Sequence, residues 1–107
     1  MIIDFEKIAE QTLENFKGGE KAVCAKMYVD DLHRIMMLKL EPGASIGMHT
    51  HDTGSEIAYI LHGTGTALYD DGEEPLSPGI CHYCPKGHSH SIRNTGTEDL
   101  IFYAVVD

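Results

Sequence analysis

Glycine and proline interrupt this chain at short, regular intervals, and these interruptions limit what it can fold into. Turn signals such as Glu41-Pro42-Gly43, Asp70-Asp71-Gly72 and Asn94-Thr95-Gly96 leave segments too short for helices but long enough for strands. The apolar or alternating segments between turns cover residues 22–29, 34–40, 57–61, 66–69, 80–84, 91–94 and 100–106. Evenly spaced short strands are typical of an all-β sandwich or barrel, so we expect that fold class.

A short amphipathic helix is expected before the strands. Apolar residues from Phe5 to Phe16 recur near the helical period, Asp4 could cap the start, and Gly18-Gly19 would end the helix. We therefore expect an N-terminal helical or extended arm over residues 1–20. A single β-barrel domain would follow over residues 21–107.

The size of the chain bears on its oligomeric state. A chain of 107 residues falls in the usual range for one domain. A domain this small buries a smaller share of its surface than a large one does, so a bound metal or a subunit interface would stabilise it. We expect a homodimer.

Charge excludes one class of partner. Eight lysine and arginine residues against seventeen aspartate and glutamate residues give a net charge of −9. Nucleic-acid binding rests on a basic surface, which this composition does not supply, and an anionic membrane surface is disfavoured for the same reason. A small-molecule substrate is the expected partner. Lys39, Lys86 and Arg93 are the candidates to attract an anionic one.

The N-terminus and the cysteine count bear on the cellular compartment in which we expect the protein. No apolar segment approaches the roughly 20 residues that cross a bilayer, and the N-terminus lacks the order of a signal peptide. Three cysteines, an odd number, fit a reducing compartment, so we expect a cytoplasmic protein. Cys81 and Cys84 form a Cys-x-x-Cys that could be redox-active or bind zinc, but packing as small apolar residues is favoured.

Histidine is the residue type that points to chemistry. His49 and His51 would share one face of a strand, because they are separated by one residue. Glu56 follows after a short turn and would begin the next strand. His90 comes much later, and if its strand lies beside the pair, three imidazoles and one carboxylate converge.

Such a donor set fits a divalent transition metal. Imidazole nitrogens with one carboxylate suit iron, manganese, nickel, cobalt or zinc, whereas magnesium and calcium prefer oxygen ligands alone. Four protein ligands on a six-coordinate ion leave two positions open. Water, dioxygen or a bidentate substrate would bind there.

The spacing of these residues resembles two motifs of the cupin superfamily. The first is Gly43-x5-His49-x-His51-x4-Glu56-x6-Gly63, and the second is Gly79-x5-Pro85-x-Gly87-x2-His90-x3-Asn94. The resemblance implies a double-stranded β-helix, or jelly roll, that is commonly dimeric and holds a metal at one end. It places the ligand roles on His49, His51, Glu56 and His90.

Three further residues, His62, His88 and Tyr83, are catalytic candidates. His62 could act as a base, although its place beside the Gly63 turn favours an exposed rim residue. His88 could be an auxiliary ligand, a proton shuttle, a substrate donor or simply a loop residue. His82 and Tyr83 alternate along one strand, so one of them faces the cavity, and the sequence leaves open which.

Three functions fit these residues. The first, which we favour, is a dioxygenase-like oxidoreductase whose metal binds dioxygen and a small substrate. The second is a metal-dependent isomerase or lyase acting on a sugar or keto acid. The third is a non-catalytic module that binds a small molecule. The resemblance alone does not choose among them, because one fold supports many activities.

Overall fold

The computed structural model describes residues 1–107 and is built almost entirely from β-strands, as expected. The ten strands are β1 (Gln11–Glu14), β2 (Ala22–Val29), β3 (Arg34–Leu40), β4 (Ser45–Thr50), β5 (Glu56–His62), β6 (Gly65–Tyr69), β7 (Gly72–Leu76), β8 (Cys81–Cys84), β9 (Ser89–Arg93) and β10 (Leu100–Val106). Two single turns of 3-10 helix, η1 (Phe5–Lys7) and η2 (Phe16–Gly18), are the only helical segments. No helix is both long and apolar enough to cross a membrane.

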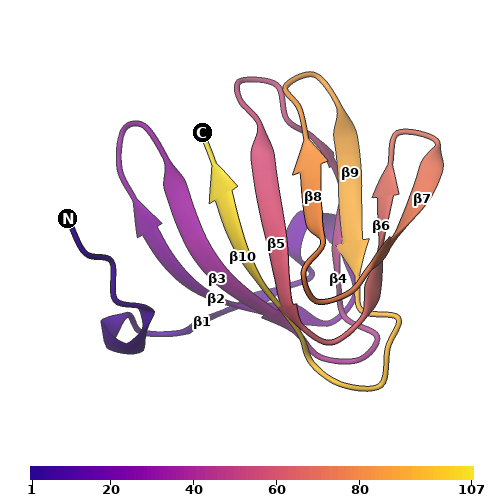
Figure 1. The fold of residues 1–107 in the computed structure, drawn as a ribbon, viewed down its shortest axis with the longest axis horizontal. Helices are drawn as coiled ribbons and strands as arrows, with labels where there is room; N and C mark the ends of the chain where they lie inside the picture. Colours follow the sequence, from indigo (N-terminus) through magenta and orange to yellow (C-terminus); the bar gives the residue numbers. More distant parts are fainter.

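The strands form two antiparallel sheets that face each other. The larger sheet has the order β1-β2-β3-β10-β5-β8, and the smaller has the order β4-β9-β6-β7. The last three strands alternate between the sheets: β8 lies in the larger, β9 in the smaller and β10 in the larger again (Figure 1). This is the jelly roll, or double-stranded β-helix, that the two motifs predicted.

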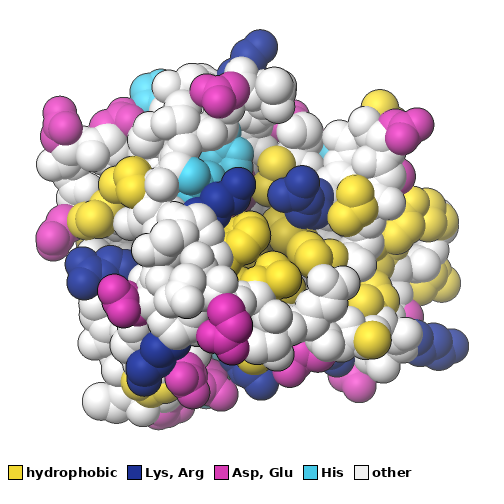
Figure 2. All heavy atoms as spheres, turned by 180° about the vertical axis from the view of Figure 1, so that it is seen from behind, with side chains coloured by type: hydrophobic (Ala, Val, Ile, Leu, Met, Phe, Trp, Pro, Cys, Tyr) yellow, Lys and Arg dark blue, Asp and Glu magenta, His cyan; other side chains and the backbone are white.

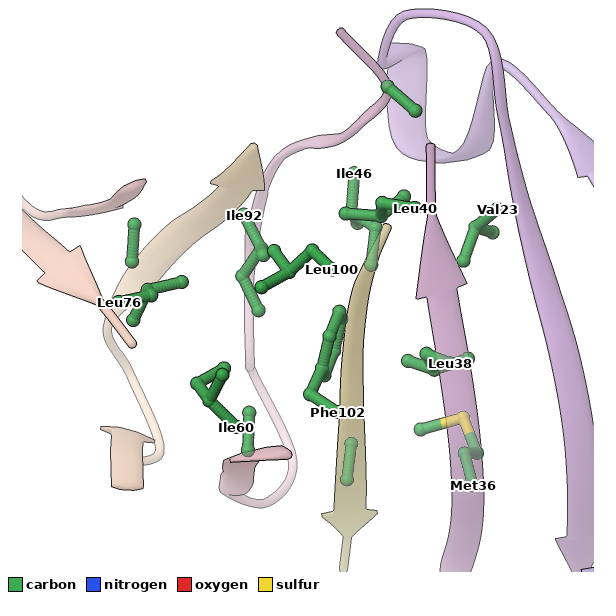
Figure 3. Close-up of a cluster of buried hydrophobic side chains, with 14 of the residues drawn as sticks. Val23, Met36, Leu38, Leu40, Ile46, Ile60, Leu76, Ile92, Leu100 and Phe102 are labelled. Atoms are coloured by element: carbon green, nitrogen blue, oxygen red, sulfur yellow. The ribbon is translucent and has the colours of Figure 1, made fainter. Parts of the chain in front are cut away.

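The core lies between the two sheets. On β3 and β10, alternate residues are buried, because successive side chains of a strand point to opposite faces. Phe102 is fully buried among Leu38, Ile60 and other apolar side chains from both sheets (Figure 3). This packing fixes the strands that carry the candidate site.

The prediction of one N-terminal helix is wrong in extent, because the segment forms only the two separate 3-10 turns η1 and η2. Asp4 does cap η1, accepting a hydrogen bond from the Glu6 backbone N–H at 3.0 Å. Beyond it, residues Gln11–Glu14 pair as an edge strand with β2. Asn15 and Lys17 then adopt left-handed backbone conformations, which a helix does not allow. Pairing with an open sheet edge, together with apolar contact of Leu13 with the core, outweighs a weak helical periodicity.

Candidate metal centre

Three strands bring the four expected ligands to one end of the barrel. His49 on β4 and His90 on β9 are directly paired across the smaller sheet. His51 follows β4, where its backbone N–H donates to the His88 carbonyl and its own carbonyl accepts from the Gly87 N–H. Glu56 begins β5 in the opposite sheet. The site therefore joins both sheets, which no single local segment could do.

The donor atoms of these residues face one another at short range. The Nε2 atoms of His49, His51 and His90 are separated by 2.9 to 3.2 Å. Glu56 Oε1 lies 3.1 Å from His51 Nε2 and 3.5 Å from His90 Nε2. All four donor atoms lie within 4.8 Å of one another. The group is positioned for a metal ion.

Hydrogen bonds on the far side of the rings fix which nitrogens carry protons. His49 Nδ1 donates to the Gly47 carbonyl at 2.8 Å, so its Nε2 presents a lone pair to the centre. His90 Nδ1 contacts His82 Nε2 at 2.9 Å, and His82 Nδ1 donates to Glu74 Oε1 at 2.8 Å. His82 thus accepts from His90, whose Nε2 is also left with a lone pair. Lone pairs that face each other call for a cation between them.

Protonation of the site agrees with cation binding. Burial lowers the pKa of His49, so this imidazole is neutral at neutral pH. Burial by itself would raise the pKa of Glu56, but hydrogen bonds with the rings of His51 and His90 outweigh it and lower that pKa to about 2. The Glu56 carboxylate is therefore ionised and available as an anionic ligand.

The donor set fits a divalent transition metal. Three imidazole nitrogens and one carboxylate oxygen match the preferences of iron, manganese, nickel, cobalt and zinc, and not the all-oxygen shells of magnesium or calcium. Bound there, such an ion would supply a Lewis acid with open positions for a substrate. His49, His51 and Glu56 all line one cavity, so substrate would reach the ion from that side.

His82 and Glu74 support the centre from behind, and the sequence did not assign them this role. The His82 side chain is buried and stacks on His90 with ring centroids 5.1 Å apart. Burial lowers the pKa of His82, which keeps it neutral and able to accept from His90. The alternation of β8 left His82 and Tyr83 as alternatives. Only the sheet orientation decides that His82 points inward.

The cavity beside the centre has a volume of about 680 Å³ and mostly apolar walls from the larger sheet. Met27 and Met36 line it, together with Ile46 from the smaller sheet. Two basic residues, Lys17 and Arg34, also line it. Figure 2 shows this combination, with basic side chains beside histidines over an apolar hollow. The sequence did not single out these two residues, because nothing local connects them to the motifs.

The other catalytic candidates lie away from the cavity. His62 is exposed at the opposite end of β5 from Glu56, where it contacts the Asp99 carbonyl and Glu98. Tyr83 points outward from β8 and is 55% exposed. His88 lies at the surface, 2.8 Å from Asp70 Oδ2 and stacked on Tyr69. None of the three lines the cavity.

The remaining candidates have other surroundings. Lys39 pairs with Glu10 at 3.9 Å, and neither Lys86 nor Arg93 lines the cavity. Cys81 is exposed and Cys84 is buried, on opposite faces of β8, so the two thiols do not meet. Burial raises the pKa of the Cys84 thiol to about 11, which keeps it protonated. Packing, the favoured interpretation of these cysteines, agrees with the burial of Cys84 and not with the exposed Cys81.

Comparison with known proteins supports the interpretation of the motifs. A family model described as the cupin domain matches residues 36–106, which include both motifs. The chain belongs to the cupin family. The oxalate-binding protein of Thermotoga maritima is 35% identical to this cupin over 113 aligned positions, covering 99% of this chain and 93% of that protein.

Solved cupin structures share the whole fold. A structure from Thermotoga maritima, described as a predicted oxalate decarboxylase, superimposes with a TM-score of 0.93 at 33% identity, covering 99% of this chain and 97% of that one. A conserved barrel domain protein from Rhodopseudomonas palustris has a TM-score of 0.80 at 16% identity, covering 94% and 72%. The second likeness shows the fold alone.

Proposed function

We propose that this cupin holds one divalent transition metal through His49, His51, Glu56 and His90 and binds a small carboxylate at the open metal positions. The observation that carries the proposal is the convergence of four donor atoms within 4.8 Å beside a cavity. Lys17 and Arg34 line the same cavity, together with Asp52 and Asp107, and neither of the two cations is in an ion pair, so both are available to an anionic ligand. The Thermotoga relative, named for oxalate binding, supports the same ligand class.

The residues of this chain have separate tasks in that function. The three imidazoles and Glu56 hold the ion, and the Glu56 carboxylate offsets part of its charge. His82 fixes the proton of His90 on Nδ1, which keeps the ligating nitrogen unprotonated. The apolar walls exclude water and so strengthen the attraction between the ion and a bound carboxylate.

Two catalytic activities on the bound carboxylate are compatible with this metal site. With iron or manganese, an oxygen-dependent oxidoreductase reaction remains our first proposal for catalysis, because the centre leaves two positions for dioxygen and substrate. A lyase reaction on the carboxylate is the second, favoured by the description of the Thermotoga structure as a predicted oxalate decarboxylase. Turnover under argon would favour the lyase, whereas uptake of dioxygen would favour the oxidoreductase.

The binding proposal is tested with the metal-loaded protein. Elemental analysis should find about one first-row ion per chain, and calorimetry should detect oxalate binding to the manganese-loaded form. The His51→Ala variant should lose the ion and the binding, whereas His62→Ala, an exposed histidine outside the cavity, should keep both. Failure of native protein to load any first-row ion would overturn the proposal.

We also propose that two copies associate through the outer face of the larger sheet. Apolar side chains that are 36 to 55% exposed gather there, namely Ile57, Tyr59, Leu61, Ile80, Tyr83 and Tyr103. They lie on or beside β5, β8 and β10, which are neighbours in one sheet. A contiguous exposed apolar patch favours a protein interface, and a second copy would cover it by symmetry.

A further inference from the structure

Arg34 lies in the same row of the larger sheet as the expected metal ligand Glu56. Arg34 pairs with Val106 of β10, and Val106 pairs with Glu56 of β5. Paired residues of an antiparallel sheet point to the same face, so all three begin on the cavity side. Neighbouring strands lie about 4.8 Å apart, which places the Cα atoms of Arg34 and Glu56 roughly 10 Å apart. A long arginine side chain can span much of that distance.

Lys17 reaches the cavity from the other sheet. Its backbone lies against β4 at Gly47, where an added Cβ would collide with the Lys17 carbonyl oxygen. Gly47 comes two residues before His49, and its carbonyl accepts the His49 Nδ1 proton. The missing side chain of Gly47 therefore brings Lys17 close to the metal ligands.

The backbone at Lys17 is unusual for a lysine. Its φ of 56° lies in the left-handed region, which residues with a Cβ avoid and where glycine is favoured. A glycine at this position would adopt the same conformation without that steric cost.

Neither cation has an acidic partner. Although the chain carries seventeen aspartate and glutamate residues, no ion pair involves Lys17 or Arg34. The recorded contact of the Lys17 ammonium is with the Phe16 ring, at 5.6 Å. Three acidic residues line the same cavity, but Glu56 faces the histidines, Asp107 accepts hydrogen bonds from Ser55, and Asp52 forms no ion pair with either cation. Two cations without an ion-pair partner fit an anionic group of a ligand.

The cavity is also larger than an oxalate requires. Its volume of about 680 Å³ falls in the range of roughly 300–1,000 Å³ that buries drug-sized ligands. Its walls include the apolar side chains Met27, Met36 and Val106, and Val106 lies between Arg34 and Glu56 in the sheet. Oxalate has no apolar segment that could use these walls.

We propose that Lys17 and Arg34 bind the second carboxylate of a ligand whose first carboxylate is on the metal, with an apolar chain between them. The ligand class is thus a dicarboxylic acid longer than oxalate. This inference rests on the proposed function and adds the ligand's length and second charge. Arg34 would bind the distal carboxylate in a bidentate manner, and Lys17 would add a point charge.

The test is a titration series with the manganese-loaded protein. Oxalate, malonate, succinate, glutarate and adipate are titrated by calorimetry, each longer acid beside its monomethyl ester. Affinity should pass through a maximum above malonate, and the best diacid should bind at least about tenfold more tightly than its ester. The Arg34→Gln and Lys17→Gln variants should remove most of that tenfold difference, and the affinity of the monomethyl ester should fall much less than that of its diacid.

Controls separate this inference from a folding defect and from the proposed function. Lys17→Gly removes the cation while easing the backbone conformation, so it should fold and still lose the diacid preference. Lys39→Gln, outside the cavity, should bind every acid as the native protein does. Equal affinity for diacid and ester, or unchanged binding in both cavity variants, would overturn the inference. If the metal loads and no carboxylate binds, oxalate included, the proposed function itself fails.

Discussion

His82 Nε2 lies 2.9 Å from His90 Nδ1, and this buried contact connects the candidate metal centre to the strands behind it. Glu74 on β7 completes the connection by accepting the proton of His82 Nδ1 at 2.8 Å. Glu74, His82 and His90 would then form a chain of hydrogen bonds that ends at a ligand of the ion. Groups behind a ligand fix its orientation and raise its basicity, so this chain of hydrogen bonds should affect how tightly the ion is held.

Removing the carboxylate behind His82 should weaken metal binding. In Glu74→Gln the amide can still occupy the site but carries no charge, so the dissociation constant for manganese should rise about 10- to 100-fold. Competition with a fluorescent chelator measures it. Glu73→Gln is the matched control, because Glu73 is the neighbouring exposed residue on β7 and contacts no histidine. Equal affinities of the two variants would contradict the prediction.

The metal-free protein should lose stability as the pH falls through about 6.5. Burial lowers the pKa of both His49 and His82 from 6.5, so the unfolded chain binds protons there first and is favoured. Glu56 acts in the same direction at lower pH, since its pKa falls from 4.5 to about 2 on folding and its contribution is lost between those values. Denaturant unfolding with chelator present, from pH 7.5 to 3, measures this. A constant free energy of unfolding from pH 7 to 5 would contradict it.

Adding one methyl group at Gly47 should displace the segment that carries Lys17. The new Cβ would meet the backbone of Lys17 and Gly18 and cannot be relieved by rotating a side chain. Gly47→Ala should therefore lower the free energy of unfolding by about 1–3 kcal/mol, as overpacking does. Gly72→Ala is the control, because its nearest atom, the Tyr69 carbonyl oxygen, would lie 3.8 Å away. Urea unfolding of both variants makes the comparison.

A charge on the outer face of the larger sheet should separate the proposed dimer. Tyr59 is 44% exposed at the centre of the apolar patch, so Tyr59→Asp would place a carboxylate in the interface. Light scattering coupled to size exclusion should give the mass of a dimer for native protein and of a monomer for the variant. Leu32→Asp, at a residue that is 73% exposed away from the patch, should remain dimeric. A monomeric native protein would refute the interface.

Truncating the central core side chain should be costly. Phe102 is fully buried between the sheets, and Phe102→Ala should lower the free energy of unfolding by about 3–5 kcal/mol through lost burial and a residual cavity. That is a large share of the roughly 5–15 kcal/mol typical of a domain. Leu32→Ala, at an exposed turn, should change it by less than about 0.5 kcal/mol. Chemical denaturation of both variants provides the measurement.

The strands and the four convergent donors were predictable from the sequence because their signals are local. Turn residues end each strand, and the two-residue period of a strand places alternate residues such as Leu38 and Leu40 on one face. His49 and His51 share a face for the same reason. Glu56 and His90 join that pair only if their strands are neighbours, and the resemblance to the family motifs implied that they are.

The tertiary structure alone decided what depends on which strands become neighbours. Alternation could not tell whether His82 or Tyr83 points inward, since that depends on which side of β8 the second sheet covers. The apolar spacing of the N-terminal segment predicts a helix. Residues Gln11–Glu14 form strand β1 instead, because they pair by hydrogen bonds with the open edge of β2. Arg34 and Lys17 reach one cavity through pairings between distant segments, and such contacts leave no periodic signal in the chain.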